Sequence, residues 1–180
     1  DYARNKGLSV INTPAASSHS VAELVFAHFY GIARFLHNSN REMPLEGDAN
    51  FKGLKKAYAK GAELRGKTLG IIGFGRIGQE VAKIGLGIGM NVIAADKFTE
   101  EATVTVTLFN GQSIAVSIKT ESFNKVLEKS DFISLHVPAQ KEYVIDASAF
   151  SKMKKGSAIV NTARGGVVDE VALIEALESG

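Results

Sequence analysis

Apolar positions along this chain follow two rhythms, and each rhythm predicts one kind of secondary structure. Short, continuous apolar runs of strand length lie at 68–72, 91–95, 132–136 and 158–161. Segments with helical spacing lie between and after these runs, near 76–85, 122–129, 147–153 and 169–178. Strands that are apolar on both faces and alternate with helices are typical of a parallel sheet covered on both sides. The pattern therefore predicts an α/β fold with a doubly wound parallel sheet.

The sequence before this alternating region has a different character. Residues 6–13 are predicted to form a short strand that ends at Pro14. Ser20 and Glu23 match a capping box, which predicts the start of a long amphipathic helix over 21–36. Spacings of three and four residues predict one buried face of that helix, formed by Val21, Leu24, Val25, His28, Phe29, Ile32 and Phe35.

Residues 38–66 are polar and irregular, and they are too long for a simple connector. We predict an arm that carries a short helix, because Phe51, Leu54 and Tyr58 recur at helical spacing. These apolar side chains need a surface to cover, which is either their own domain or a second copy of the chain. We favour a symmetric partner and expect a homodimer.

One stretch interrupts the alternation of strands and helices. Residues 103–108 and 113–118 each alternate with period two, and Asn110-Gly111 lies between them. This pattern predicts a β-hairpin inserted at 103–118. The hairpin is expected to be either separate from the sheet or joined to it through its second arm.

Composition excludes several classes of function. A formal net charge of +2 is too small for a nucleic-acid footprint, and no apolar run approaches the length of a membrane span. There are no cysteines, which excludes disulfides and thiolate metal sites and suits a cytoplasmic location. The chain starts at Asp1 without a methionine or a leader sequence, so we expect a fragment of a longer protein.

A glycine-rich turn, Gly73-Phe74-Gly75-Arg76-Ile77-Gly78, follows the predicted strand 68–72 and opens the next predicted helix. In this context the pattern predicts a Rossmann-like dinucleotide site rather than a glycine turn without a ligand. The first glycine permits the tight turn, the second leaves room for the pyrophosphate, and the third lets helix and strand pack closely. Unpaired amides and the helix dipole at this end favour phosphates.

The cofactor is predicted to be NAD, because the second strand ends in an acidic residue. Asp96 lies 18 positions after Gly78, where it would accept hydrogen bonds from the adenosine ribose and repel a 2′-phosphate. Lys97 is either a cation for that phosphate or a solvated lysine, and we favour the second interpretation. A second run, Gly85–Gly89, ends a helix instead of opening one, so Gly89 is predicted to be a cap and not part of a phosphate loop.

Four motifs together resemble the D-2-hydroxyacid dehydrogenase family. In chain order they lie at 12–14 with 20–23, at 68–78, at 131–138 and at 161–166. The resemblance covers nearly all of the chain, and it implies an NAD-dependent oxidoreductase that acts on a small D-2-hydroxy or 2-keto acid. Within the family, the motifs are most similar to the branch that oxidises D-3-phosphoglycerate at the start of serine biosynthesis.

The resemblance also implies roles for individual residues around the cofactor. Arg76 and Ile77 would contact the pyrophosphate through their backbone. The nucleotide cleft would be lined by His136, Val137 and Pro138, at the end of a predicted strand.

At the nicotinamide end, the resemblance implies Thr162, Ala163 and Arg164, with Arg164 as the catalytic arginine. Its place after the carboxyl end of a predicted parallel strand agrees with where open α/β sheets bind ligands. A guanidinium offers two parallel donors to the carboxylate and the carbonyl oxygen of a 2-keto acid, so it would orient the substrate and polarise the ketone. A surface arginine at a strand end is the alternative.

Hydride chemistry also needs a proton donor, which in this family is a histidine steadied by a glutamate, both expected beyond Gly180. His136 matches the strand end at the cofactor cleft, and His19, His28 and His37 are predicted to be packed or solvated. No two histidines have metal-ligand spacing with a carboxylate, so no metal site is predicted. We therefore expect the chain alone to bind the cofactor without turnover.

These inferences define an expected domain organisation. We expect 1–19 to be a hinge segment from a substrate domain, 20–66 to form the long helix and the arm, and 67–180 to form the Rossmann core. The strongest alternative is an NAD-sensing regulatory protein of the co-repressor type with the same fold. A third hypothesis is a stand-alone NAD-binding module that is never catalytic, and the missing initiator methionine argues against it. The hairpin at 103–118 exceeds the family's usual link and is expected to be a decoration or an interface element.

Overall fold

A four-stranded parallel sheet forms the centre of the molecule. We describe residues 2–180 from a computed structural model. The strands are β1 (Thr68–Ile72), β2 (Asn91–Ala95), β5 (Phe132–Leu135) and β6 (Ala158–Asn161). They lie in the order β2-β1-β5-β6, and every pair is parallel. The order reverses at β1, so the doubly wound parallel sheet predicted from the apolar runs is confirmed.

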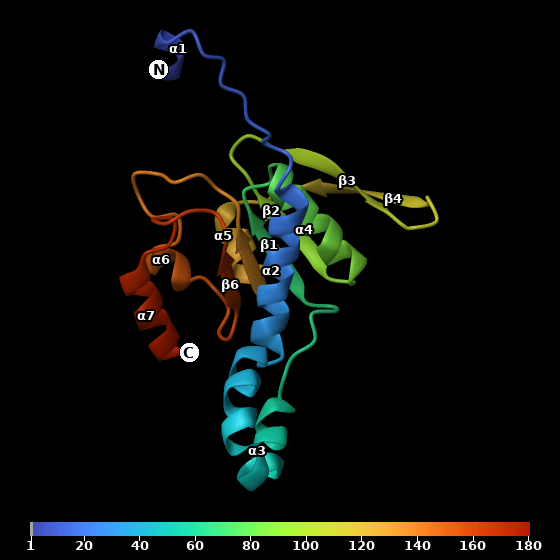
Figure 1. The fold of residues 1–180 in the computed structure, drawn as a ribbon, viewed down its shortest axis with the longest axis vertical. Coiled ribbons are helices and arrows are strands. Elements are labelled where there is room, and N and C mark those ends of the chain that lie inside the picture. The colour runs from blue at the N-terminus through green and yellow to red at the C-terminus, as the bar shows by residue number, and fades with distance from the viewer. Residues whose placement is uncertain (1) are drawn as a thin grey trace.

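Helices cover both faces of this sheet (Figure 1). One face packs against α2 (Ser18–Ala33) and α4 (Arg76–Gly87), and the other lies towards α5 (Phe123–Lys129), α6 (Ala147–Phe150) and α7 (Glu170–Ser179). Adjacent residues of β1 divide between the two layers, since Ile71 joins the first core and Ile72 the second. This division explains why the strands are apolar at successive positions.

Short polar side chains begin the helices on the second face. Ser122, Asp146 and Asp169 each accept a hydrogen bond from a backbone amide in the first turn of α5, α6 and α7 respectively. Such N-caps satisfy amides that have no partner inside the helix. The start of each of these helices therefore follows from one residue of the sequence.

The predicted hairpin is confirmed as β3 (Glu101–Thr107) and β4 (Ser113–Lys119), which form a separate antiparallel pair. Its buried face includes Val104 and Ile118, which join the core beside α4. Directly after the second arm, Thr120 forms an isolated bridge with Ala94 of β2, and the Glu121 amide donates to the Ala94 carbonyl at 2.7 Å. The hairpin reverses in a turn closed by a 2.9 Å bond from the Gly111 amide to the Leu108 carbonyl, with Gly111 at φ +84°.

The first long helix differs from its prediction in three respects. It begins at Ser18, and Ser20 bonds back to the Ser17 carbonyl, so the predicted capping box does not form. It ends at Ala33, because Phe35 adopts a left-handed conformation with φ +55°. The buried positions within the helix are Ser18, Ala22, Val25, Phe26, Phe29 and Ala33.

Leu24 and Ile32, both predicted to be buried, are about half exposed, at 48% and 50%. The helix carries apolar residues on more than one face, and its buried positions include the small side chains of Ala22 and Ala33. Spacing alone does not identify that face. His28, which belongs to the same predicted face, is also exposed, so the prediction of the buried face is wrong at three positions.

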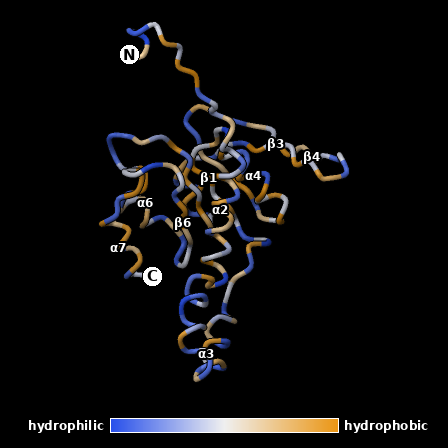
Figure 2. Tube along the Cα trace, in the orientation of Figure 1, coloured by the Kyte–Doolittle hydropathy of each residue, from blue (hydrophilic) through white to orange (hydrophobic). Residues whose placement is uncertain are grey.

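The arm is more helical than the sequence indicated. Residues 36–58 form α3 (Leu36–Tyr58), which bends at Asn50 and turns back on itself below the sheet (Figure 1). Tyr58 donates a hydrogen bond to Glu42 across this bend, and that bond raises the pKa of Tyr58 to about 12. Apart from Leu54, which is buried, most positions of α3 are exposed. Many of its residues are hydrophilic (Figure 2). The predicted irregular arm is therefore corrected to a bent helix.

The N-terminal segment extends away from the sheet (Figure 1). It holds a single helical turn, α1 (Tyr2–Asn5), and residues 8–13 are extended but pair with no strand in the described chain. The predicted strand at 6–13 is therefore not formed, because a strand needs a neighbour for its backbone groups. Within residues 2–180, no helix is both long enough and apolar enough to cross a membrane.

Candidate functional site

The carboxyl ends of β1, β2, β5 and β6 meet at one edge of the sheet, where the predicted site residues lie. β1 leads directly into the glycine turn, and each terminal glycine of that turn has a packing reason. Gly73 has φ +96°, and a Cβ there would lie 2.5 Å from the His136 carbonyl oxygen. A Cβ on Gly78 would lie 2.2 Å from the Gly73 carbonyl oxygen. The protein's own backbone therefore requires glycine at both positions.

Gly75, between them, is different. Its φ of −77° and ψ of −161° suit any residue, and a Cβ there would meet no atom within 4 Å. Neither backbone conformation nor internal packing requires this glycine. The open space beside Gly75 lies at the start of α4 (Arg76–Gly87). It would allow a ligand to approach the backbone closely.

Unpaired donors surround this open space. The amides of Gly75, Arg76 and Ile77 find no acceptor within residues 2–180, and no side chain caps α4. The ring of Phe74 is fully buried in the core, and it holds the turn against the rest of the domain. The start of α4 therefore offers an anchored set of amides and the positive end of a helix dipole, which suits a pyrophosphate.

Asp96 ends β2 beside the turn and is tied to it. Its Oδ2 accepts from the Phe74 amide at 2.6 Å, and its Oδ1 accepts from Phe98 and Thr99 at 2.8 and 2.9 Å. Partial burial opposes ionisation, but these amides outweigh it and hold the pKa of Asp96 below its usual value. Asp96 is therefore an anion at neutral pH that also positions the glycine turn, a second role that sequence spacing did not reveal.

A cleft of about 570 Å³ opens beside this carboxylate. Six of the predicted residues line it, namely Gly73, Gly75, Asp96, His136, Val137 and Pro138. Further lining residues were not predicted for this role, and they include Lys97, Phe98, Phe123, Gln140 and Val144. Lys97 does not point freely into water, because its Nζ donates to Gln140 Oε1 at 3.3 Å. The mixed polar and apolar lining and the volume fit the adenosine half of a dinucleotide.

His136 supports the cleft as a neutral ring. Its Nε2 lies 2.8 Å from Ser134 Oγ, a hydroxyl that is itself fully buried. Burial lowers the pKa of His136 to about 4. The ring is therefore uncharged at neutral pH, and Ser134 is a supporting residue that the continuous apolar pattern of β5 concealed.

The loop after β6 carries three further predicted residues, Thr162, Ala163 and Arg164, which do not line the 570 Å³ cleft. Asn161 holds it, because its side chain accepts from the Ala163 amide and donates to the Arg164 carbonyl, both at 3.0 Å. The Thr162 hydroxyl is buried without a hydrogen-bond partner in the described chain. Arg164 is exposed, and its Nη1 donates to the Ala163 carbonyl at 2.7 Å. An orphaned hydroxyl and a guanidinium that contacts only its own loop suit a site that a ligand completes.

The other histidines lie away from this loop or are exposed. His19 Nδ1 lies 3.0 Å from Glu80 on α4, while His28 and His37 are exposed on α2 and α3. Across the described part of the chain, no group of three His, Cys, Asp or Glu side chains is arranged to hold a metal ion.

Comparisons with known proteins agree with this geometry. The profile of the family described as "D-isomer specific 2-hydroxyacid dehydrogenase, NAD binding domain" matches residues 26–180. Hydroxypyruvate reductase from Thermotoga maritima is 44% identical over 180 residues, which cover 99% of this chain and 53% of that protein. D-3-phosphoglycerate dehydrogenase from Methanocaldococcus jannaschii is 39% identical over 182 residues, which cover 100% of this chain and 32% of that protein.

Among solved structures, an NAD-dependent formate dehydrogenase from Staphylococcus aureus in complex with NAD is similar. The TM-score is 0.72 at 32% identity, and the match covers 91% of this chain and 45% of that one. The chain therefore spans from 32% to 53% of the length of these relatives.

Proposed function

Because the chain belongs to the D-isomer specific 2-hydroxyacid dehydrogenase family, as its NAD-binding domain, we propose that it binds NAD across the carboxyl edge of its sheet, with the pyrophosphate on Gly73–Gly78. One observation carries this proposal. A Cβ on Gly75 would meet no atom within 4 Å, so the packing of the chain does not require a glycine there. The amides of Gly75, Arg76 and Ile77 also find no acceptor within residues 2–180. We further propose that the longer parent protein transfers hydride between NAD and a D-2-hydroxy acid.

The residues at this edge have distinct tasks in the proposal. The amides of Arg76 and Ile77 bind the pyrophosphate at the start of α4. Asp96 accepts from the adenosine ribose, and His136, Val137 and Pro138 line the cleft around the adenosine.

At the other end of the cofactor, Thr162 and Ala163 contact the nicotinamide, and the Thr162 hydroxyl gains the partner that it lacks. Asn161 positions the loop but does not touch the cofactor. When bound, NAD supplies the hydride acceptor.

Arg164 is the proposed catalytic residue. Its guanidinium leaves the Ala163 carbonyl, which it contacts at 2.7 Å, and turns to the carboxylate and C2 oxygen of the substrate. Paired donors there orient the substrate, and in the reductive direction they stabilise the negative charge that grows on the oxygen.

None of the four histidines is placed to exchange the substrate's proton. His136 is buried with Ser134, His19 contacts Glu80, and the other two are exposed on helices. We therefore propose that the chain binds NAD(H) but does not turn over, and that a histidine and a glutamate elsewhere in the parent protein complete the site.

The proposed substrate is D-3-phosphoglycerate, in serine biosynthesis. The 39% identity to a protein named D-3-phosphoglycerate dehydrogenase supports it, whereas the 44% identity to one named hydroxypyruvate reductase makes hydroxypyruvate the competing substrate. The co-repressor alternative gains no support from the relatives described above. Steady-state comparison of both substrates on the parent protein distinguishes them.

We also propose a homodimer formed through α2 and the arm. Leu24, Ile32, Leu36, Leu45 and Phe51 are all exposed in the single chain. Leu54 is only 5% exposed, so it packs within its own chain and is not the interface residue that its spacing suggested. Phe51→Asp should therefore weaken the dimer in light scattering, while Leu54→Asp damages the arm itself. A monomer at all concentrations would contradict the dimer.

The central experiment is calorimetric titration of the chain with NAD and NADH, followed by an assay with NADH and 3-phosphohydroxypyruvate. We expect saturable binding of both nucleotides and no turnover. Arg164→Gln should leave nucleotide binding unchanged in the chain and should abolish turnover in the parent protein. Failure to bind either nucleotide would overturn the proposal, and steady turnover by the chain alone would show that the proton donor is misassigned.

A further inference from the structure

The hairpin of β3 and β4 leaves one long strand edge without a neighbour. β4 pairs with β3 along its whole length, and directly after β4 Thr120 bridges to Ala94, so the other edge of β4 faces the main sheet. Among the strands of residues 2–180, β3 pairs with β4 alone. Its other edge faces outwards along the upper side of the hairpin in Figure 1. β3 is therefore an edge strand.

The backbone groups on this edge belong to the odd-numbered residues of β3. The Leu108 amide donates to the Gln112 carbonyl at 2.7 Å, and the Thr120 amide donates to the Glu100 carbonyl at 2.8 Å. Even-numbered residues therefore bond across the hairpin. Since bonded and non-bonded pairs alternate between antiparallel strands, the odd-numbered residues within 101–107 direct their amides and carbonyls away from β4.

This edge lacks the features that normally keep a strand edge apart from other chains. Natural edge strands are short, carry a bulge, or hold a lysine or proline. β3 keeps an unbroken register with β4 over all 7 of its residues, and residues 102–107 contain neither a charge nor a proline. A regular, uncharged edge of this length suits the addition of another strand.

Exposed aromatic side chains at the two ends of β3 indicate which strand pairs with it. Phe98 lies before β3 and is 95% exposed, and Phe109 lies in the turn after β3 and is fully exposed. Within residues 2–180 they are the two most exposed of the large apolar side chains. An antiparallel copy of β3 brings the turn of each chain beside the loop before β3 of the other. Each Phe109 can then cover the other copy's Phe98.

Full overlap of two copies of β3 defines one register. A two-fold axis at Val104 pairs all 7 residues of the strand, with Thr103 opposite Thr105 and Glu101 opposite Thr107. No two charges of the same sign then face each other, and the opposed threonines are a favourable cross-strand pair. The outward backbone groups of Thr103 and Thr105 also face one another, as a bonded pair requires.

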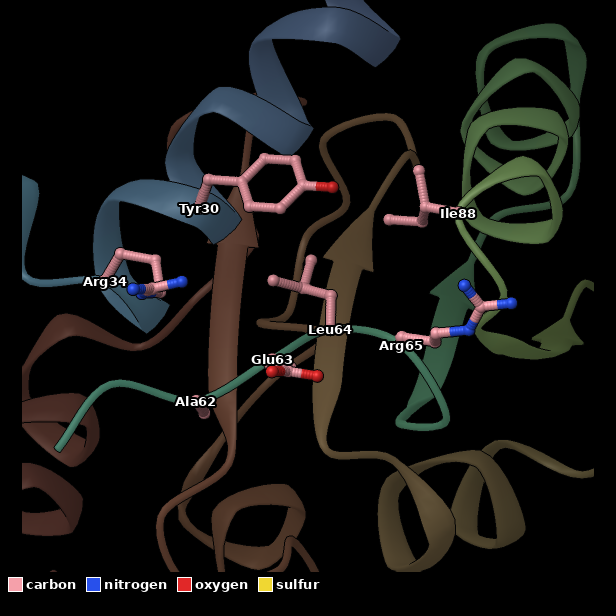
Figure 3. A pocket seen from close by; sticks show the side chains of 7 residues that line it. All are labelled: Tyr30, Arg34, Ala62, Glu63, Leu64, Arg65 and Ile88. Atoms are coloured by element: carbon pink, nitrogen blue, oxygen red, sulfur yellow. The ribbon is translucent and has the colours of Figure 1, made fainter. Parts of the chain in front are cut away.

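This edge is separate from the surface proposed for the homodimer. The linker 62–65, which joins the arm to β1, passes a hollow of about 250 Å³ between Tyr30 of α2 and Ile88, the residue after α4 (Figure 3). The arm therefore meets the domain beside α2. α4 contacts both α2 and β3 and lies between them (Figure 1). The two surfaces belong to different elements and can be changed separately.

We propose that β3 pairs with the β3 of a second copy, antiparallel about a two-fold axis at Val104, so that two hairpins form one continuous sheet. The backbone groups on the outer edge of residues 101–107 supply the hydrogen bonds, and the aromatic ends cover one another. Because Phe98 lines the 570 Å³ cleft, the turn of each copy lies at the mouth of the other copy's cleft.

Proline variants on the two strands of the hairpin test this pairing. Thr105 and Ala115 face each other in a non-bonded pair, so proline at either position removes no hydrogen bond within the hairpin. Both are placed in a chain that carries Phe51→Asp, which removes the proposed contact of the arm. By analytical ultracentrifugation, Phe51→Asp alone should still form a dimer. Adding Thr105→Pro should weaken that dimer at least about 100-fold, because it removes a donor and places a ring on the paired edge.

Adding Ala115→Pro is the matched control and should leave the dimer in place. The melting temperature should be similar in both proline variants. A Phe51→Asp chain that is a monomer at all concentrations would overturn the proposal. Equal losses with both prolines, or no loss with Thr105→Pro, would overturn it as well.

Cysteine cross-linking tests the register, because the unmodified chain contains no cysteine. Thr103 of one copy lies opposite Thr105 of the other at a Cα separation of roughly 5.5 Å, which a disulfide can span. A mixture of Thr103→Cys and Thr105→Cys proteins should therefore cross-link on oxidation. A mixture of Thr103→Cys and Ser117→Cys proteins is the control and should not, since Ser117 lies on β4. Equal cross-linking in both mixtures, or of Thr105→Cys with itself, would overturn the proposed pairing.

Discussion

Helix α4 has a glycine-rich run at each end, Gly73–Gly78 around its start and Gly85–Gly89 across its last turn. At the last turn the chain supplies its own partners, since Gly89 donates to the Leu86 carbonyl at 3.0 Å and Met90 donates to the Gly85 carbonyl at 2.9 Å. Gly89 itself has φ +83°, as expected for a helix cap. At the start, by contrast, the chain leaves three amides without acceptors.

The comparison shows how to distinguish a glycine kept for the chain from one kept for a ligand. What matters is which atoms a Cβ would meet. On Gly73 and Gly78 it meets backbone, and on Gly85 it meets the Leu69 side chain. On Gly75 it meets nothing, although the residue lies at the start of a helix, where anions bind. The motif therefore contains two kinds of glycine. Gly73 and Gly78 are required by the surrounding backbone, whereas Gly75 leaves space that fits a ligand.

The largest expected effect is on the free energy of unfolding, and it distinguishes the buried glycines at the two ends of α4, Gly78 and Gly85. Gly78→Ala places a Cβ 2.2 Å from a backbone oxygen that cannot move alone, so we expect a loss of roughly 3 kcal/mol or more in unfolding free energy. Gly85→Ala places one 2.8 Å from Leu69 Cδ2, the end of a side chain that can adjust. Together with the better helix propensity of alanine, its change should stay within about 1 kcal/mol. Equal losses in urea unfolding would contradict the distinction.

The second prediction concerns charge at the carboxyl edge. An unfolded histidine takes up a proton near pH 6.5, whereas the folded protein holds the pKa of His136 at about 4. Stability from the neutral ring is therefore fully present above pH 6.5 and is lost as the pH falls from 6.5 towards 4. The loss should be on the order of 3 kcal/mol.

Urea unfolding of His136→Gln should lack most of this decline between pH 6.5 and 4. Asp96 does not mask it, because the lowered pKa of this carboxylate moves its own loss of stability below about pH 4. An unchanged slope in the variant would show that another group is responsible.

The third prediction compares the two open glycines. Neither Gly75 nor Gly87 has an atom within 4 Å of a built Cβ, so both alanine variants should unfold within about 1 kcal/mol of the unmodified chain. Only Gly75→Ala should affect the nucleotide, weakening NAD binding roughly 100-fold because its methyl group takes the place of the pyrophosphate. Calorimetry that found the same affinity for both variants would remove the main support for the site.

Sequence patterns predicted the core better than the periphery. The bounds of β1, β2 and β6 follow directly from apolar runs, because a strand buried on both faces tolerates few polar residues. The extended run at 8–13 has the same composition but no neighbouring strand in the described chain, and a single sequence does not reveal whether a strand has a partner. The buried face of α2 was predicted only in part, at Val25 and Phe29, since packing and not spacing alone decides it.

The site was predictable where a motif fixes the backbone and less so where side chains cooperate at long range. Gly73–Gly78 and Asp96 stand at a recognisable spacing. The bond between Asp96 and the Phe74 amide joins residues 22 positions apart, and no local pattern encodes it. Asn161 could have been found, because an asparagine at the end of a strand can bond to the backbone two residues on.

The smallest predicted effect concerns the preference for NAD over NADP. It depends on the hydrogen bond through which Asp96 also positions the glycine turn. Asp96→Ala removes both the proposed ribose acceptor and the observed acceptor for the Phe74 amide, so NAD affinity should fall while NADP, no longer repelled, is less affected. The preference for NAD should narrow about tenfold, near 1.4 kcal/mol.

Asp96→Asn separates the two roles, because its single amide oxygen can still accept from the turn. If NAD affinity depends mainly on the position of the glycine turn, the asparagine variant should bind NAD more tightly than the alanine variant does. The ratio of NAD affinity to NADP affinity should be similar in the two variants. Lys97→Gln tests the neighbouring cation, and because Lys97 already donates to Gln140 we expect little change in NADP binding. Calorimetry that found NADP bound more tightly than NAD by the unmodified chain would reject the assignment of Asp96 altogether.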